Sequence, residues 1–332
     1  MQASSVTRAL CLALLLVVAP LTAAVPAHAQ GYPSKPITML IPFAAGGPTD
    51  VVGRLVGEHM SRTLGQPVII ENAVGAAGTL AGTRLMGMTP DGHTILIGHT
   101  GTHAAAVTLN PNLKYKPLED FAHIGLVNTN PIFVNVRKSH EANTLQEFVT
   151  WLKANEAKAN NAHAGIGSVS HTTCLLFNSV VGVKVAGVAY RGTGPAMNDL
   201  VGGQVDYLCD QAVNVAPQQR AGTIKTLAVA QENRTPAMPD VPTSTEAGLP
   251  AFKVIVWNAM FAPKATPPEV VEKLSNALRA ALADAEVRGK LEQLGAEIPT
   301  AEQQTPSGLK TFIASEIDRW SPIIKAAGVT IQ

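Results

Sequence analysis

The sequence has few charged and few aromatic residues. Only 15% of its 332 residues are Asp, Glu, Lys or Arg, against about 25% in typical soluble domains. The 25 basic residues nearly balance the 24 acidic ones, and aromatic residues make up 5%. Such a chain lacks the basic field and the stacking surface that nucleic-acid binding needs. Its hydrophobic content of 46% excludes intrinsic disorder, and its length suggests two domains.

Common cofactor and metal motifs are also missing. The chain has no G-x-x-x-x-G-K-[ST] motif and no dinucleotide fingerprint after a strand, so no nucleotide cofactor is expected. His99 and His103 have a metal-ligand spacing only on a helix, and Gly101 between them favours a polar loop. We therefore expect no metal and no cofactor. Gly167 to His171 is not the G-x-S-x-G of a hydrolase, although a serine hydrolase using Ser170 and His171 stays open as an alternative.

The first thirty residues have the pattern of a secretory signal peptide. Arg8 precedes an apolar run at 9–19, Pro20 ends that run, and an A-x-A cleavage pattern ends at Ala29. We expect residues 1–29 to be removed and the rest to be exported, with an uncleaved anchor as the alternative. Cys11 lies in this segment, which leaves Cys174 and Cys209. In an oxidising compartment this pair predicts a disulfide, and two buried thiols are the alternative.

After the signal, short apolar runs alternate with amphipathic stretches, which is typical of an α/β protein with a parallel, doubly wound sheet. Strands are predicted at 37–43, 67–71, 94–98, 164–167, 185–190, 205–209 and 224–230. Two longer extended runs, 124–138 and 252–263, suggest that the chain crosses twice between two domains. The helical tail from Pro267 would then return to the first domain. A cleft between such domains is a favoured ligand site.

The loops after several strands are rich in small and hydroxyl residues and lead directly into helices. Gly46 and Gly47 precede one helix, and 75–78 precedes another. A helix N-terminus has unpaired N–H groups and partial positive charge, so these loops suit an anion such as a carboxylate. Ser168, Ser170 and Thr193 would add hydroxyl donors in the second half. Arg191 is either a bidentate partner for a carboxylate or a surface residue.

A series of longer motifs resembles one known family. PFAAGGPTD (42–50), ENAVGAAGT (71–79), PDGHTILIG (90–98), YRGTGPAMNDLVGGQVD (190–206), MPDVPTSTEAGLP (238–250) and APKATPPEVVEKL (262–274) occur in order over the mature chain. They resemble the Bug (TctC-like) family of extracytoplasmic solute receptors, the binding proteins of tripartite tricarboxylate transporters. The resemblance implies a type II periplasmic binding protein: two α/β lobes joined by two crossing strands, with the ligand cleft between them. The lobes would be 30–131 with 259–332, and 132–258.

The resemblance also implies a function and a binding site. It predicts a periplasmic monomer that is not an enzyme, binds a small di- or tricarboxylate or an aromatic acid, and works with membrane subunits of a transporter. A receptor that feeds a signalling system is an alternative. The ligand contacts carried over are Phe43, Gly46, Gly47, Thr49, Ala76, Ala77, Gly78, Thr100, Gly167, Ser168, Ser170, His171, Arg191 and Asp210. Ala77 stands where the family has Gly, and its methyl group is expected to narrow the pocket. His171 either contacts ligand or only packs.

Overall fold

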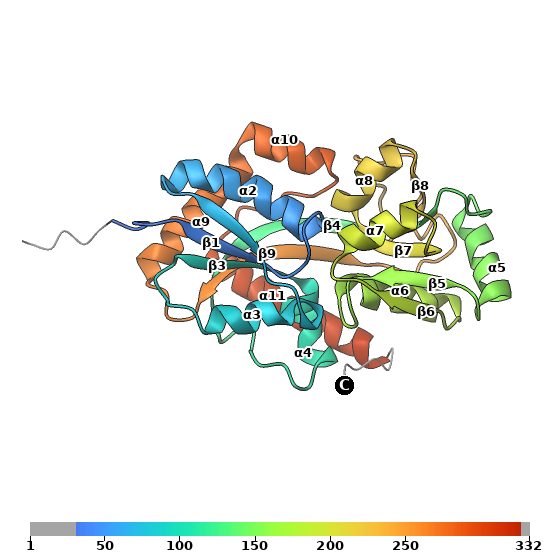
Figure 1. Cartoon of the computed structure of the whole chain (residues 1–332), viewed down its shortest axis with the longest axis horizontal. Helices are drawn as coiled ribbons and strands as arrows, with labels where there is room; N and C mark the ends of the chain where they lie inside the picture. The colour runs from blue at the N-terminus through green and yellow to red at the C-terminus, as the bar shows by residue number, and fades with distance from the viewer. Residues whose placement is uncertain (1–30, 327–332) are drawn as a thin grey trace, which may run out of the picture.

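The computed structural model describes residues 31–326, so the predicted signal peptide and its cleavage site lie outside the described residues. Within 31–326, none of the helices has the length and apolar character needed to cross a bilayer. The described residues form a nine-stranded sheet in the order β2-β1-β3-β9-β4-β7-β5-β6, with β8 paired to β4. Helices cover both faces of this sheet (Figure 1). The predicted α/β class is confirmed.

The first half of the chain forms a small parallel sheet. Its elements are β1 (Ile37–Ile41), α2 (Pro48–Leu64), β2 (Val68–Asn72), η1 (Ala76–Gly78), α3 (Thr79–Met86), β3 (Thr94–His99), η2 (Gly101–Ala105) and α4 (Ala106–Leu109). Strand β1 lies between β2 and β3 and is parallel to both. The predicted polar loop around Gly101 is instead a buried π-helical turn, η2, that continues directly into α4.

Two long strands connect the halves of the molecule. Strands β4 (Phe121–Arg137) and β9 (Ile255–Pro263) pair antiparallel along the middle of the molecule (Figure 1). Strand β9 also pairs with β3 of the first half, whereas the far end of β4 pairs with β7 and β8 of the second half. The predicted boundaries at residues 131 and 259 fall inside these two strands, and this division into lobes stays a prediction.

The second half repeats the α/β arrangement. Its elements are α5 (Leu145–Asn155), β5 (Asn160–His163), α6 (Val169–Val181), β6 (Ala186–Ala189), α7 (Thr193–Val201), β7 (Tyr207–Gln211), α8 (Ala212–Arg220) and β8 (Ile224–Val229). Strand β5 is parallel to β6 and β7. The strand predicted at 164–167 is wrong, because β5 ends at His163. Gly165 and Gly167 have φ angles of +99° and +90°, which no strand residue adopts.

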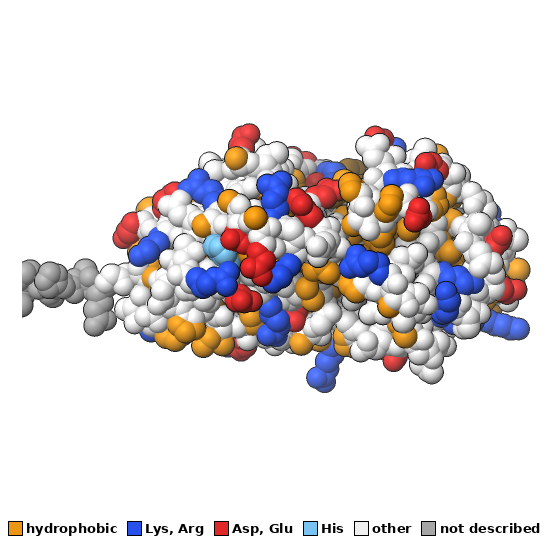
Figure 2. All heavy atoms as spheres, turned by 90° about the horizontal axis from the view of Figure 1, so that it is seen from above, with side chains coloured by type: hydrophobic (Ala, Val, Ile, Leu, Met, Phe, Trp, Pro, Cys, Tyr) orange, Lys and Arg blue, Asp and Glu red, His pale blue; other side chains and the backbone are white. Residues whose placement is uncertain are grey.

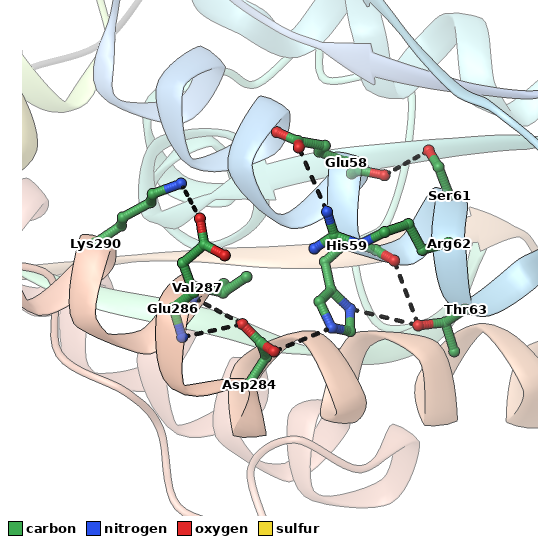
Figure 3. Close-up of polar contacts among 10 residues, drawn as sticks. Glu58, His59, Ser61, Arg62, Thr63, Asp284, Glu286, Val287 and Lys290 are labelled. Carbon is green, nitrogen blue, oxygen red and sulfur yellow. Dashed lines mark hydrogen bonds and ion pairs between the residues drawn. The ribbon is translucent and has the colours of Figure 1, made fainter.

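The C-terminal helices pack on the first half. Helices α9 (Pro268–Ala283) and α10 (Ala285–Gln293) lie beside α2, while α11 (Pro306–Ala326) covers the opposite face of the sheet (Figure 1). Asp284, between α9 and α10, caps α10 by accepting the backbone N–H groups of Glu286 and Val287 at 3.1 and 3.0 Å. Its carboxylate also lies 3.7 Å from Nε2 of His59 on α2 (Figure 3). The tail is thereby attached to α2.

On the face seen from above, basic and acidic side chains are interspersed and no broad patch of one sign stands out (Figure 2). This distribution agrees with the near balance of the two signs in the sequence. This face therefore lacks the broad positive field that nucleic-acid binding requires.

Candidate functional site

A small cavity lies where strands of both halves end. Three helices begin at its wall: α2 at its N-cap Gly47, α6 at its N-cap Ser168, and α7 at its first residue, Thr193. The lining residues are Phe43, Gly47, Pro48, Thr49, His99, Ile132, Ala164, Ser168, Val169, Ser170, Thr193, Cys209, Asp210 and Gln211.

The two halves touch each other at the rim of this cavity. The backbone N–H of Ala44, after β1, donates to the carbonyl of Arg191, before α7, at 3.2 Å. A Cβ placed on Gly194 would be 2.9 Å from the carbonyl carbon of Gly46, and one on Gly192 would be 3.1 Å from the nitrogen of Ala44. The loops approach this closely because glycine has no side chain there. The structure therefore shows the cleft closed.

The start of α2 is held in place by polar side chains. Thr49 Oγ1 donates to Oδ1 of Asn258 on β9 at 3.1 Å. Asp50 accepts the backbone N–H of Gly46 at 3.0 Å and is paired with Arg54 at 2.9 Å. Burial favours the neutral form of Asp50, but these partners outweigh it and lower its pKa. These contacts hold the loop before α2 in place, and Gly47 of this loop lines the cavity.

His99 lines the cavity and has a hydrogen-bond donor that the described residues do not use. Its ring stacks on Phe43 with the centroids 4.9 Å apart. Its Nδ1 accepts the backbone N–H groups of Gly101 at 2.7 Å and Thr102 at 3.3 Å. Burial lowers the pKa of His99 to about 4, so the ring is neutral near pH 7. Because Nδ1 is an acceptor, the proton is on Nε2, which makes no hydrogen bond to the described residues.

On the other wall, serine hydroxyls organise the β5–α6 loop. Ser168 Oγ accepts the backbone N–H of His171 at 3.3 Å, which caps α6, and it lies 3.2 Å from Ser170 Oγ. Ser170 Oγ accepts the N–H of Ala164 at 2.9 Å. His171 Nδ1 accepts the N–H of Gly167 at 3.1 Å. The His171 side chain therefore supports the loop and is not hydrogen-bonded to Ser170.

This geometry contradicts the hydrolase alternative. A serine nucleophile needs a hydrogen bond to its base, whereas Ser170 and His171 each bind a different backbone N–H group of the loop. Burial and the nearby His163 lower the pKa of His171 to about 4, which is also low for a base working at neutral pH. Residues 31–326 contain no cluster of three potential metal ligands.

Six of the fourteen predicted contact residues line the cavity: Phe43, Gly47, Thr49, Ser168, Ser170 and Asp210. The other eight do not line it: Gly46, Ala76, Ala77, Gly78, Thr100, Gly167, His171 and Arg191. Several of these support residues that do. Thr100 Oγ1, for example, accepts the backbone N–H of Trp257 on β9 at 2.8 Å and so ties the end of β3 to a crossing strand.

Ala77, whose methyl group is predicted to narrow the pocket, lies outside the residues that line this cavity. Ala76 and Ala77 both have left-handed backbone angles, with φ of +46° and +53°. In this conformation Ala77 faces the opposite half, where a Cβ on Gly165 would be 3.8 Å from its Cα. The residue therefore lies between the two loops at the rim and carries backbone strain that glycine would not.

The cavity also includes residues that are not among the predicted contacts, namely Pro48, His99, Ile132, Ala164, Val169 and Gln211. His99 and Gln211 are the last residues of β3 and β7. Ligands of α/β sheets bind at the carboxyl ends of the strands, and this rule is the sequence signal that points to both residues.

The predicted disulfide is wrong in this structure, because Cys174 and Cys209 are both free, buried thiols. They are adjacent, and the backbone N–H of Cys209 donates to Sγ of Cys174 at 3.2 Å. Burial raises the pKa of the Cys209 thiol, which keeps it protonated. Here the two side chains fill the core between α6 and β7 as small apolar groups.

Comparisons with known proteins agree with this architecture. A model of the family described as tripartite tricarboxylate transporter family receptor matches residues 52–329. A protein from the TAR-I ttuE-ttuC' intergenic region of Agrobacterium vitis is 41% identical over 303 residues, covering 91% of this chain and 87% of that protein.

Three solved structures are also similar. MatC from Rhodopseudomonas palustris, with bound malate, has 46% identity and a TM-score of 0.86, covering 88% of this chain and all of that one. The periplasmic binding protein BugD has 40% identity and a TM-score of 0.88, covering 91% of this chain and all of that one. A further R. palustris protein, with adipate, has 29% identity and a TM-score of 0.86, covering 90% of this chain and 99% of that one.

Proposed function

The chain belongs to the tripartite tricarboxylate transporter receptor family, and we propose that its cavity captures a small carboxylate for transport. It is a solute-binding receptor with the periplasmic binding protein fold, and not an enzyme. The family places the protein in the periplasm. The ligand class, cleavage after Ala29, delivery to membrane subunits, the monomeric state and ligand contacts by the six predicted residues that line the cavity are parts of the proposal.

The observation that carries the ligand class is the set of hydrogen-bond donors around the cavity. The N-termini of α2 and α6 meet there, and each has unpaired N–H groups and a partial positive charge. Neutral His99, whose free donor is Nε2–H, and Ser168 line the same cavity. Converging donors of this kind fit the oxygens of a carboxylate.

The wall of the cavity would hold an anion without a cationic side chain. None of the lining residues in the described part of the chain is Lys or Arg. Neutral donors hold an anion without a compensating buried charge, so release needs no ion pair to be broken. The malate and adipate bound by two similar proteins are both small carboxylates, which supports the same class here.

The closed cleft suggests how binding would be signalled. A ligand that contacts both walls stabilises the closed form relative to the open one, so the population shifts toward closure. The hydrogen bond from Ala44 to Arg191 and the glycine contacts at the rim exist in this closed form. A membrane subunit that recognises the closed surface would then receive loaded receptor in preference to empty receptor.

Thermal unfolding with a panel of acids tests the ligand class. Succinate, malate, citrate, adipate and benzoate are each compared with their uncharged amides at matched concentration. We expect at least one acid to raise the unfolding free energy by about 2.7 kcal/mol at a hundredfold excess over Kd, and its amide to have no effect. A chain that no acid stabilises, and that hydrolyses an ester, would overturn the proposal.

A variant that fills the cavity tests the location. Ala164 lines the cavity, whereas Ala301 is exposed in a turn far along the chain. We expect Ala164→Leu to abolish the ligand-dependent stabilisation while the protein still unfolds cooperatively. Ala301→Leu, the matched control, should keep the wild-type response. Equal responses of both variants to the acid would place the binding site elsewhere.

A further inference from the structure

Asp210 has an unusual position for an acidic side chain in a proposed anion site. It is the next-to-last residue of β7, lines the cavity, and is 1% exposed. Among the lining residues in the described part of the chain, it is also the only Asp, Glu, Lys or Arg. A buried carboxylate beside a bound anion would repel it, so a site that only held an anion would gain nothing from this residue.

The partners of Asp210 leave room for one more donor. Its Oδ1 accepts the backbone N–H of Gln211 at 2.8 Å, and its Oδ2 accepts Nδ2 of Asn214 at 2.5 Å. Each carboxylate oxygen thus accepts one hydrogen bond from the protein, whereas a carboxylate can accept about four in all. Acceptor capacity therefore remains on a carboxylate that lines the cavity.

The rest of the wall offers mainly donors. His99 Nε2–H, the helix N-termini and the hydroxyls can satisfy a ligand carboxylate, as the proposed function requires. Asp210 can only accept when ionised. Burial raises its pKa to about 6, which leaves it mostly ionised at neutral pH. A ligand that satisfies both kinds of group must have a carboxylate and, separately, a hydrogen-bond donor.

We infer that Asp210 is a specificity-determining residue, which selects carboxylates bearing a hydroxyl or ammonium donor over equally long acids without one. This inference rests on the proposed carboxylate function and names the ligand class within it. An acid that lacks the donor would leave the remaining acceptor capacity of Asp210 unused inside a closed cavity. Sites built to bind a ligand hydroxyl reject analogues without it, because their buried polar groups are then unpaired.

Calorimetry with matched ligand pairs tests the inference. The pairs are succinate and L-malate, propanoate and L-lactate, and phenylacetate and mandelate; L-aspartate adds an ammonium group to succinate. In the wild type we expect the hydroxy acid of every pair that binds to do so at least about tenfold more tightly than its partner. In Asp210→Ala this ratio should fall close to 1. The control Asp240→Ala, at an exposed acidic residue, should keep the wild-type ratio.

A variant that is merely damaged should lose affinity for both acids of a pair equally, which leaves the ratio of their affinities unchanged. A change in this ratio therefore indicates a loss of ligand selectivity. If Asp210→Ala does not fold, Asp210→Asn has the same shape and retains a neutral acceptor. It should weaken L-aspartate binding more than L-malate binding, because only the ammonium group loses a charged partner. Equal wild-type affinities within a pair, or a ratio unchanged in Asp210→Ala, would overturn this inference alone. Binding of none of these acids to the wild type would overturn it together with the proposed function.

Discussion

Closing the cleft depends on Gly194, and replacing it with alanine is a direct test of that dependence. Gly194 is the second residue of α7 and faces the α2 loop of the other half. A Cβ there would lie 2.9 Å from the carbonyl carbon of Gly46 and 3.1 Å from the oxygens of Ala45 and Gly46. All of these are backbone atoms, so no side chain can rotate away. The loops must therefore separate.

The magnitude follows from this overlap. Forcing a methyl group into a closely packed contact costs about 1–3 kcal/mol, which corresponds to a loss of affinity of roughly 5–150-fold. The open form has no such contact and is not penalised. Gly194 has a helical backbone that alanine prefers by about 0.5–1 kcal/mol. Gly194→Ala should therefore bind its acid more weakly while unfolding at the same or a higher temperature.

The assay combines calorimetry with small-angle scattering. We expect the wild type to become more compact on adding a saturating acid, and Gly194→Ala to show weaker binding and a smaller change. Gly289 on α10 is the matched control, because a Cβ there would meet nothing within 4 Å. Gly289→Ala should bind and compact like the wild type. If Gly194→Ala did the same, the rim contact would not limit closure.

Three further outcomes are expected. Ala77→Gly should raise the unfolding free energy by about 1 kcal/mol, because the left-handed backbone at Ala77 is strained for alanine; a lower free energy in urea titration would contradict this. Thr100→Val should lower it by about 1–3 kcal/mol by leaving a buried backbone N–H of β9 unpaired. Thr100→Ser keeps the hydroxyl and should stay near wild type in the same titration. Burial lowers the pKa of His99 and of His123 to about 4, so the unfolded chain, with histidines near 6.5, binds more protons. Stability from these histidines should be complete above about pH 6.5 and fall as the pH drops toward 4, by up to about 3 kcal/mol each, as followed by thermal unfolding. Because the pKa of Asp210 is raised, its contribution to stability increases as the pH falls and opposes that of the histidines. A melting temperature that rose from pH 6.5 to pH 4 would refute the histidine argument.

The fold could be predicted largely from hydrophobic periodicity. The runs at 37–43 and 224–230 contain the strands β1 and β8, and the run at 94–98 covers all of β3 except its last residue, because continuous apolar segments bounded by turns suit buried strands. The strand placed at 164–167 was wrong because the preceding segment, 160–163, has Asn and His at three of its four positions. Burial of polar residues in β5 depends on hydrogen bonds from the rest of the fold, which periodicity does not report.

The candidate site was predictable to the level of loops but not of side chains. Sequence reasoning found the carboxyl ends of the strands, yet it chose Thr100 where His99 lines the cavity. The two residues differ by one position. They lie where β3 passes into the π-helical turn, and such turns are rare and hard to foresee from a sequence.

The glycines at the rim show a deeper limit of sequence reasoning. Gly46 has a positive φ and is needed for its own turn, so local backbone geometry explains it. Gly192 and Gly194 have no such requirement, and each is glycine because the other half of the molecule approaches within contact distance. In the sequence both kinds occur in similar Gly-rich loops ahead of helices. Only the glycines at 192 and 194 are needed for the cleft to close. Closure brings together two chain segments about 150 residues apart, so this need is seen only in the three-dimensional structure.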